Sequence, residues 1–215
     1  MAGTFLSSAF FQATDEQAMW RVKMEDDAQA FAQLVKRWEK PIQSLCARMT
    51  GDAHQGEDLA QEAFARIFAR RKDYQPSGRF ATYLWRVAVN LCYDELRRVS
   101  RRRESALETT NGSGEEMDFA AGSPAPDFAL VEQERAEAVR RALLELTEPY
   151  RAVVVLRHYE GLKFREIGEV LEIPEGTVKS RMAEALAQLN ELLNDYEREI
   201  PCKPQIKSNP GMTPI

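Results

Sequence analysis

The chain has 215 residues, enough for one ordinary domain or two small ones. Hydrophobic residues make up 44% and charged residues 29%, which is typical of a folded globular protein and excludes a largely disordered one. The formal net charge of −5 would argue against nucleic-acid binding if the charge were spread evenly along the chain.

Cysteines are few and widely separated. Cys46, Cys92 and Cys202 form no C-x-x-C pair, and His54 and His158 are the only histidines that could join them as metal ligands. Such a set predicts free thiols in a reducing cytoplasm, with no zinc site and no cofactor. No segment approaches the ~20 apolar residues of a membrane span, and the N-terminus lacks the features of a secretion signal. We therefore expect a cytoplasmic protein without membrane insertion.

Helical periodicity is the dominant local pattern. Apolar residues recur at three- and four-residue spacing along residues 31–49, 59–68, 80–96 and 139–193. Pro41 lies within the first stretch, where a proline kinks a helix or divides it in two. Because no stretch alternates with period two, the sequence predicts an all-α fold.

The periodicity stops between residues 104 and 127, where turn formers, prolines and acidic residues predominate. This stretch predicts a flexible acidic linker between two small helical domains. The proline-rich end of the chain is expected to be disordered, the alternative being a regulatory contact. The predicted organisation is an N-terminal extension, a first domain, a linker, a second domain and a tail, with bounds 1–24, 25–103, 104–134, 135–195 and 196–215.

Residues 161–181 carry the most specific local pattern. A helix over about 164–171 is followed by Ile173, expected in the core, and by Pro174 at the first position of a second helix. Gly168 allows the second helix to approach closely. This spacing predicts a helix-turn-helix, whose second helix lays its N-terminal residues in the major groove of DNA. The alternative is a plain helical hairpin with a polar outer face.

Charge is strongly segregated along the chain. Residues 63–103 hold eleven Arg or Lys against three Asp or Glu, whereas residues 104–137 hold nine acidic residues against one Arg. A basic stripe of this kind is typical of a phosphate-binding surface. The overall acidity is therefore compatible with local affinity for DNA.

Aromatic residues interrupt the basic stripe at Tyr74, Phe80, Tyr83 and Trp85. Aromatic faces beside cationic side chains suit unpaired bases, although a single ring more often packs in a core. We expect Phe80 in the core. For Tyr83 and Trp85, contact with a base and packing in the core are both possible. Asn90 either is buried with its hydrogen bonds satisfied or reads a base edge through its amide.

Five segments, in this order, carry a resemblance to a known family: DAQAFAQLVKRW (27–38), GEDLAQEAF (56–64), FATYLWRVAVNLCYDELRR (80–98), TEPYRAVVVL (147–156) and PEGTVKSR (174–181). Together they resemble the extracytoplasmic-function (ECF, group IV) sigma factors of bacterial RNA polymerase. The resemblance implies that the first domain is a sigma region 2 helical bundle and the second a sigma region 4 helix-turn-helix.

The resemblance implies an initiation subunit that binds core RNA polymerase and directs promoter recognition, DNA melting and transcription initiation. It implies no enzyme activity, because catalysis belongs to the polymerase. The implied partners are the β′ clamp helices and β flap of core polymerase, promoter DNA and an anti-sigma factor. Such a protein is associated with the nucleoid when active, and an anti-sigma factor would hold it, at the membrane in some cases, until an envelope or stress signal arrives.

The resemblance also assigns site residues. It implies that polymerase is bound by Glu57, Asp58, Leu59, Gln61, Glu62 and Phe64, where the alternative for the acidic members is a solvated charged face. It implies that the minus-ten element is bound by Arg79, Tyr83, Trp85, Arg86, Asn90, Asp94, Arg97 and Arg98. In this reading Asn90 captures a flipped base, and the loop around residues 71–79 forms part of the pocket.

The minus-thirty-five element would be bound by Thr177, Lys179, Ser180, Arg181, Ala183 and Glu184. Here the chain departs from the family, because Glu184 and Leu186 stand where arginines are usual. A lost phosphate contact weakens binding and its salt dependence, whereas a carboxylate accepts a hydrogen bond from cytosine N4. We therefore expect an altered preference, with Lys179 and Ser180 as the main readers. In the first domain, Tyr83 and Trp85 exchange the usual order of the aromatics.

Two other functions remain as alternatives. A regulator that binds promoters without docking on polymerase differs only in making no use of the acidic segment at residues 56–64. A small helical enzyme finds little support, because the sequence has no Ser/His/Asp set and no glycine-rich phosphate loop. Glu57, Asp58 and Glu62 could in principle bind a divalent ion, but we do not expect one there.

Overall fold

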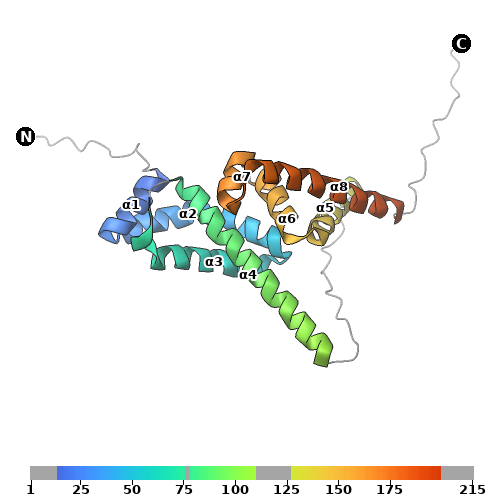
Figure 1. Cartoon of the computed structure of the whole chain (residues 1–215), viewed down its shortest axis with the longest axis horizontal. Helices are drawn as coiled ribbons and strands as arrows, with labels where there is room; N and C mark the ends of the chain where they lie inside the picture. The colour runs from blue at the N-terminus through green and yellow to red at the C-terminus, as the bar shows by residue number, and fades with distance from the viewer. Residues whose placement is uncertain (1–13, 76–77, 110–126, 200–215) are drawn as a thin grey trace, which may run out of the picture.

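The computed structural model describes residues 14–75, 78–109 and 127–199, and its regular structure in these ranges is entirely helical (Figure 1). The first module consists of α1 (Asp15–Glu25), α2 (Ala28–Thr50), α3 (Ala53–Ala69), the short 3-10 helix η1 (Arg71–Asp73) and α4 (Phe80–Thr109). The second module consists of α5 (Asp127–Glu145), α6 (Glu148–Val154), the π-helical turn η2 (Val155–Tyr159), α7 (Phe164–Leu171) and α8 (Glu175–Glu199). The predicted all-α fold is confirmed.

Helix α1 belongs to the core of the first module, although the sequence pattern left residues 1–24 as an extension. Thr14 and Gln17 form a capping box at its start, in which each side chain accepts from the other residue's backbone N–H. Met19 and Val22 are fully buried. The short helix has only one narrow apolar face, which explains why periodicity alone did not reveal it.

Helices α2 and α3 form a tight antiparallel pair. Gly51 ends α2 in the left-handed conformation (φ 85°), and Asp52 then caps α3 by accepting from two backbone N–H groups. A side chain on Gly56 would collide with the backbone of Ala47, so this glycine permits the close approach. Pro41 lies inside α2, which continues through it as one helix.

The core of the first module is closed by α4. Phe80, Leu84 and Leu91 on this helix are buried against α2 and α3. Glu16 of α1 accepts a hydrogen bond from the backbone N–H of Phe80 at 3.1 Å and so caps the start of α4. Burying this apolar face at about 25 cal/mol per Å² provides the main drive for assembly of the module.

The predicted helix-turn-helix is present in the second module. Val178, Met182 and Ala185 on α8 are buried, while Ile173 in the turn packs against the same core. A side chain on Gly168 would lie 2.8 Å from the carbonyl oxygen of Ile173, so the glycine makes room for the turn rather than for the second helix.

The helices extend into the predicted linker from both sides. Helix α4 continues to Thr109 and α5 begins at Asp127, so residues 104–109 and 127–134 are helical rather than loop. The rest of the predicted linker, residues 110–126, lies outside the described residues. At the C-terminus α8 includes residues 196–199, and the remaining tail, like residues 1–13, is outside the description. Among the described helices, none combines the length and the apolar character that crossing a membrane requires.

The two modules pack against each other. Helix α7 lies against α4, while α5, α6 and η2 contact α2 (Figure 1). Gly51 at the end of α2 meets the side chain of Leu144, and the guanidinium of Arg48 lies over the ring of Tyr159 at 4.3 Å from its centroid. The sequence predicted two tethered domains, and the structure adds a direct interface between them.

Candidate nucleic-acid interface

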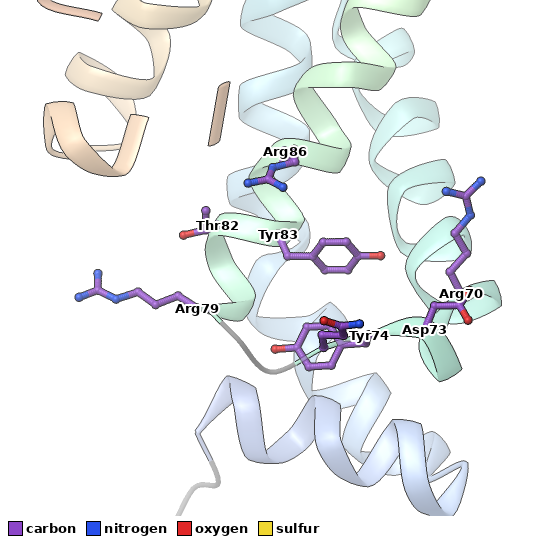
Figure 2. A pocket seen from close by; sticks show the side chains of 9 residues that line it. Arg70, Asp73, Tyr74, Arg79, Thr82, Tyr83 and Arg86 are labelled. Atoms are coloured by element: carbon purple, nitrogen blue, oxygen red, sulfur yellow. The ribbon is translucent and has the colours of Figure 1, made fainter. Parts of the chain in front are cut away.

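An open pocket of about 440 Å³ lies between η1 and the first turns of α4 (Figure 2). It is lined by Arg70, Asp73, Tyr74, Gln75, Gly78, Arg79, Thr82, Tyr83 and Arg86. Figure 2 shows the two tyrosine rings between Arg79 and Thr82 on one side and Arg70 and Asp73 on the other. The pocket therefore combines flat aromatic surface with guanidinium groups, which is the chemistry that stacks an unpaired base and holds its phosphates.

Tyr74 is held firmly in the floor of this pocket. Its ring meets Phe80 edge-on and Tyr83 at a tilt, with centroids 6.3 and 5.7 Å away, and Lys23 Nζ donates to its carbonyl oxygen at 2.6 Å. The residue is 5% exposed, yet its hydroxyl has no hydrogen-bond partner among the residues that the structure describes. Burial raises the pKa of both Tyr74 and Tyr83, so both phenols are neutral at pH 7. A buried hydroxyl that lacks a partner has a free-energy cost, which a hydrogen bond to a water or a ligand would relieve.

Three of the residues predicted for the minus-ten element, Arg79, Tyr83 and Arg86, line the pocket. Trp85 does not, because it is 5% exposed and its ring packs edge-on against Trp38 at 5.7 Å. Of the two possibilities left open for Trp85, the structure shows the packed one, in the core beside Trp38. Two residues along a helix correspond to a rotation of about 200°, so Tyr83 and Trp85 face opposite ways.

Asn90 is exposed, which decides between its two predicted states, but it does not line the pocket. It lies about two helical turns beyond Tyr83 and about one turn beyond Arg86 on α4. Asn90 is thus not part of this pocket, and its capture of a flipped base stays a prediction. Asp94, Arg97 and Arg98 follow on the exposed part of α4, where Arg98 forms an ion pair with Glu95 at 2.6 Å.

Asp73, Tyr74, Gln75 and Gly78 belong to the loop around residues 71–79 that was expected to form part of the pocket, whereas Arg70 and Thr82 were not among the predicted site residues. The signal available in the sequence was the basic run at residues 70–72, with Tyr74 two residues further on. The fold adds which residues of this turn line the cavity beside the start of α4.

The acidic flank predicted to bind polymerase lies on α3. Glu57, Asp58, Gln61 and Glu62 are all exposed. The two apolar members of the predicted set are not available for direct contact: Leu59 and Phe64 are 4% and 6% exposed and belong to the core. The physical reason is that α3 turns its apolar face towards α2.

The residues predicted for the minus-thirty-five element lie at the start of α8. Lys179, Ser180, Ala183 and Glu184 are exposed and Thr177 is half-buried. Lys179 pairs with Glu175 at 2.7 Å, the Ser180 hydroxyl donates to the Thr177 carbonyl at 3.0 Å, and Gln188 donates to Glu184 at 3.1 Å. These contacts within one helix leave the outer face of α8 open.

Arg181 differs from the rest of this set because it is half-buried. Burial raises the pKa of Tyr93 on α4 to about 12, and the positive charge of Arg181 opposes that rise. Arg181 is thus less exposed than Lys179 and Ser180, and its charge acts on Tyr93 of the first module.

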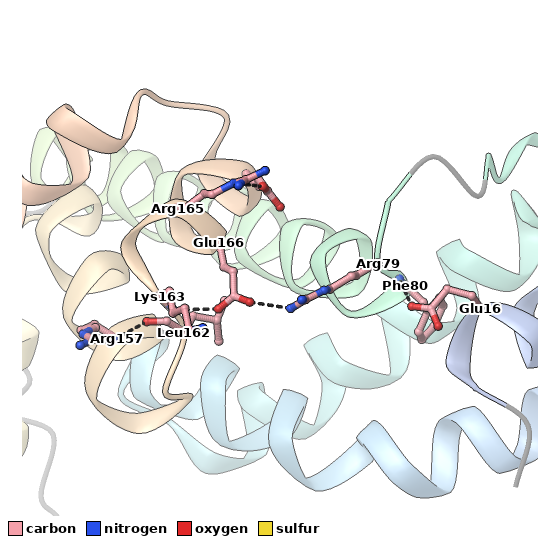
Figure 3. A network of polar contacts seen from close by, with 9 residues as sticks. Glu16, Arg79, Phe80, Arg157, Leu162, Lys163, Arg165 and Glu166 are labelled. Carbon is pink, nitrogen blue, oxygen red and sulfur yellow. Dashed lines mark hydrogen bonds and ion pairs between the residues drawn. The ribbon is translucent and has the colours of Figure 1, made fainter.

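Two arginines of the pocket are also in contact with the second module. Arg79 Nη1 lies 2.5 Å from Glu166 Oε1 of α7, and Arg86 Nη1 lies 2.9 Å from Glu172 Oε1 in the following turn (Figure 3 shows the first pair). Arg86 Nη2 also donates to the Glu169 carbonyl at 2.6 Å. The backbone N–H of Lys163 and the charge of Arg79 lower the pKa of Glu166, so its carboxyl is ionised at pH 7.

Within the described ranges, no group of three or more His, Cys, Asp or Glu side chains is placed to hold a metal ion. Cys46 and Cys92 are free, buried thiols. A hydrogen bond between the two side chains, together with burial, raises the pKa of Cys92 above its ordinary value. Both cysteines thus act as core residues and not as nucleophiles.

Comparison with known proteins identifies both modules. The family model of Sigma-70 region 2 matches residues 34–102, and that of Sigma-70 region 4 matches residues 136–189. Among curated relatives, the ECF RNA polymerase sigma factor SigW of Bacillus subtilis is 35% identical over 171 residues, which cover 79% of this chain and 91% of SigW.

Solved structures show the same fold. CnrH, solved in complex with the cytosolic domain of CnrY, has a TM-score of 0.62 at 21% identity, covering 85% of this chain and 99% of CnrH. The sigma factor RpoE of Bartonella quintana, solved with the anti-sigma factor NepR, has a TM-score of 0.59 at 18% identity, covering 78% and 98%. The matches to both modules and to SigW together show that the chain belongs to the ECF family of RNA polymerase sigma factors.

Proposed function

We propose that this chain is an initiation subunit that binds core RNA polymerase and directs promoter recognition, DNA melting and transcription initiation, with no catalysis of its own. One observation carries the proposal. A single chain combines an arginine-ringed pocket around Tyr74 and Tyr83, suited to an unpaired base, with a helix-turn-helix suited to intact duplex. A protein that binds only duplex DNA does not need the base pocket. A protein that binds only single strands does not need the helix-turn-helix.

We assign residues 25–103 to sigma region 2 and residues 135–195 to sigma region 4. Helix α1 joins the first of these, because Met19 and Val22 are part of its core. The minus-ten strand would enter the pocket at Arg79, Tyr83 and Arg86.

The path of the minus-ten strand would continue along the exposed face of α4. Asn90, Asp94, Arg97 and Arg98 lie on that face, beyond the pocket. In this arrangement Asn90 contacts the strand outside the pocket, while the arginines hold phosphates.

The minus-thirty-five element would be read by α8. Lys179, Ser180 and Glu184 present side chains with hydrogen-bonding groups on its exposed N-terminal half, with Thr177 and Ala183 beside them. Glu184 accepts but does not donate hydrogen bonds when ionised, so we expect it to favour a cytosine over a phosphate contact.

Polymerase would be bound through the exposed acids of α3. Glu57, Asp58 and Glu62 present like charge on one side of this helix, with Gln61 among them. We propose that they face the basic side chains of the β′ clamp helices, while the second module docks on the β flap. Complementary charge of this kind raises the rate of association more than it raises affinity.

We infer an anti-sigma partner that holds the chain inactive until an envelope or stress signal arrives. CnrH and the Bartonella quintana RpoE were both solved with a partner protein, in the second case an anti-sigma factor. Because promoter DNA and core polymerase are its proposed targets, its site of action is the cytoplasm.

In vitro transcription tests the proposal directly. Purified chain is added to core polymerase lacking any other sigma factor, with fragmented genomic DNA as template, and start sites are mapped. We expect discrete start sites that share two upstream elements. Random initiation, or binding to DNA without polymerase association in a pull-down, would support a regulator instead.

A further inference from the structure

We propose that α7 and the turn after it form an intramolecular latch, in which Glu166 and Glu172 occupy the pocket arginines Arg79 and Arg86 and keep promoter DNA out until it displaces them. This inference rests on the proposed function, because it takes these arginines to be phosphate ligands. The contacts themselves are direct, at 2.5 Å for Arg79 to Glu166 and 2.9 Å for Arg86 to Glu172.

The carboxylate of Glu166 is held in position to imitate a phosphate. One oxygen accepts from the backbone N–H of Lys163 at 2.8 Å, at the start of α7, while the other faces Arg79 (Figure 3). Guanidinium groups bind carboxylates and phosphates through the same planar donors. Glu166 and a DNA phosphate therefore compete for the same group, the guanidinium of Arg79.

Glu172 occupies a position at which its side chain has a conformational cost. It ends α7 in the left-handed conformation, with φ 56° and ψ 40°, where glycine is the usual residue because other side chains crowd the backbone. This chain keeps a glutamate there, and that glutamate reaches Arg86 in the other module. Its place in the turn is better explained by the contact between modules than by the helix-turn-helix itself.

The closed arrangement is incompatible with reading both promoter elements at once. Their names place them roughly 25 base pairs apart, or about 85 Å of duplex at 3.4 Å per base pair. In the structure α7 touches α4, so the two DNA-binding modules are adjacent. The latch must open before both elements are bound, and the closed form is the promoter-free state.

The latch is weak enough to be reversible. The side chains of Arg79 and Glu172 are 73% and 66% exposed, so salt screens both pairs. An exposed ion pair shifts an equilibrium by about two- to fivefold. Two such ion pairs reduce the fraction of molecules in which the arginines are free to bind DNA. They do not prevent a polyanion from displacing the glutamates.

Binding of single-stranded DNA to the full chain tests the latch. A fluorescein-labelled dT20 oligonucleotide is titrated at low salt, and fluorescence anisotropy gives the Kd. We expect the Glu166→Gln/Glu172→Gln variant to bind about fivefold more tightly than the parent. The matched control is Glu39→Gln/Glu191→Gln, which removes the same charge from exposed positions away from the interface and should change Kd less than about twofold.

A double-mutant cycle tests whether the two glutamates act through the pocket arginines. In an Arg79→Gln/Arg86→Gln background, the gain from removing the two glutamates should disappear. Glu172→Gly provides a second route, because glycine suits the left-handed turn. This variant should bind dT20 more tightly than the parent while keeping its melting temperature.

An unchanged Kd, an equal gain in the control, or a gain that persists without the arginines would overturn the latch. Transcription with core polymerase separates this result from the proposed function. If the parent and the glutamine variant both fail to initiate, the function is wrong, whatever the oligonucleotide shows. If both initiate and their dT20 affinities are equal, only the latch is wrong.

Discussion

The guanidinium of Arg151 donates a hydrogen bond to the backbone carbonyl of Met49, and this buried contact joins the second module to the end of α2. Arg151 also donates to the carbonyls of Leu143, Leu144 and Leu146 around the end of α5. Carbonyl groups at helix C-termini lack partners within the helix and carry partial negative charge. A single cation thus satisfies the ends of two helices from different modules.

Replacing Arg151 with Met should lower the free energy of unfolding by about 3 kcal/mol, because several buried carbonyls lose their donor. Arg151→Lys should lower the free energy of unfolding almost as much, because an ammonium group lacks the planar set of donors that reaches several acceptors. Urea denaturation measures both. Arg140→Met is the control, because Arg140 is exposed and pairs with Glu137 on the same helix. A loss no greater than that of the control would show that Arg151 is not a structural clamp.

Replacing Tyr74 with Phe should separate stability from function. The Tyr74 hydroxyl is buried and has no partner within the described part of the chain, so its removal should leave the melting temperature equal or higher. If the hydroxyl donates to a captured base, the same change should slow open-complex formation about five- to tenfold, equivalent to about one hydrogen bond. Polymerase affinity, measured in parallel, should not change. Normal opening by the variant would mean that the base is held without this hydroxyl.

Reversing charge on the acidic flank should weaken polymerase binding without unfolding the chain. Glu57→Lys/Asp58→Lys changes exposed side chains and should reduce the association rate with core polymerase at least about tenfold at low salt, with less effect at high salt. Surface plasmon resonance at two salt concentrations measures the rates. Glu134→Lys/Glu145→Lys, on the exposed surface of α5, is the charge-matched control. Equal losses in the two variants would favour a solvated face for α3.

Glu184→Arg should change promoter preference in the second module. An added arginine contributes about one phosphate contact, so the salt slope of duplex binding should steepen by about one unit. If Glu184 reads a cytosine, the variant should also lose discrimination at one base pair of the minus-thirty-five element. Selection from randomised duplexes with the holoenzyme measures this. An unchanged preference and salt slope would exclude Glu184 from the interface.

Glu160 makes the folded chain sensitive to pH. Burial raises the pKa of its carboxyl above the ordinary 4.5, with the charge of Arg48 opposing the rise, so the unfolded chain ionises first as pH increases. Its contribution to stability is therefore present below the unfolded pKa and is lost as pH rises through the folded one. Glu160→Gln should be more stable than the parent at about pH 7, with the difference shrinking towards about pH 4. Urea midpoints across this range measure it, and a constant difference would contradict the assignment.

Much of the architecture could be predicted because helices and turns are local. The spacing of Gly168, Ile173 and Pro174 specified the helix-turn-helix, since each acts on backbone within a few residues. The basic character of α4 and the acidic flank of α3 are likewise properties of short segments. Helix α1 escaped prediction because its packing, not its periodicity, makes it part of the core.

For some individual side chains, burial could not be predicted from the sequence. Trp85 and Tyr83 are equally plausible stacking rings in the sequence, and the rotation of α4 against α2 sends one to the core and the other to the pocket. The contact of Arg79 with Glu166 joins residues 87 positions apart. Such pairs depend on how whole helices dock, and docking is governed by apolar faces far from the charges that it brings together.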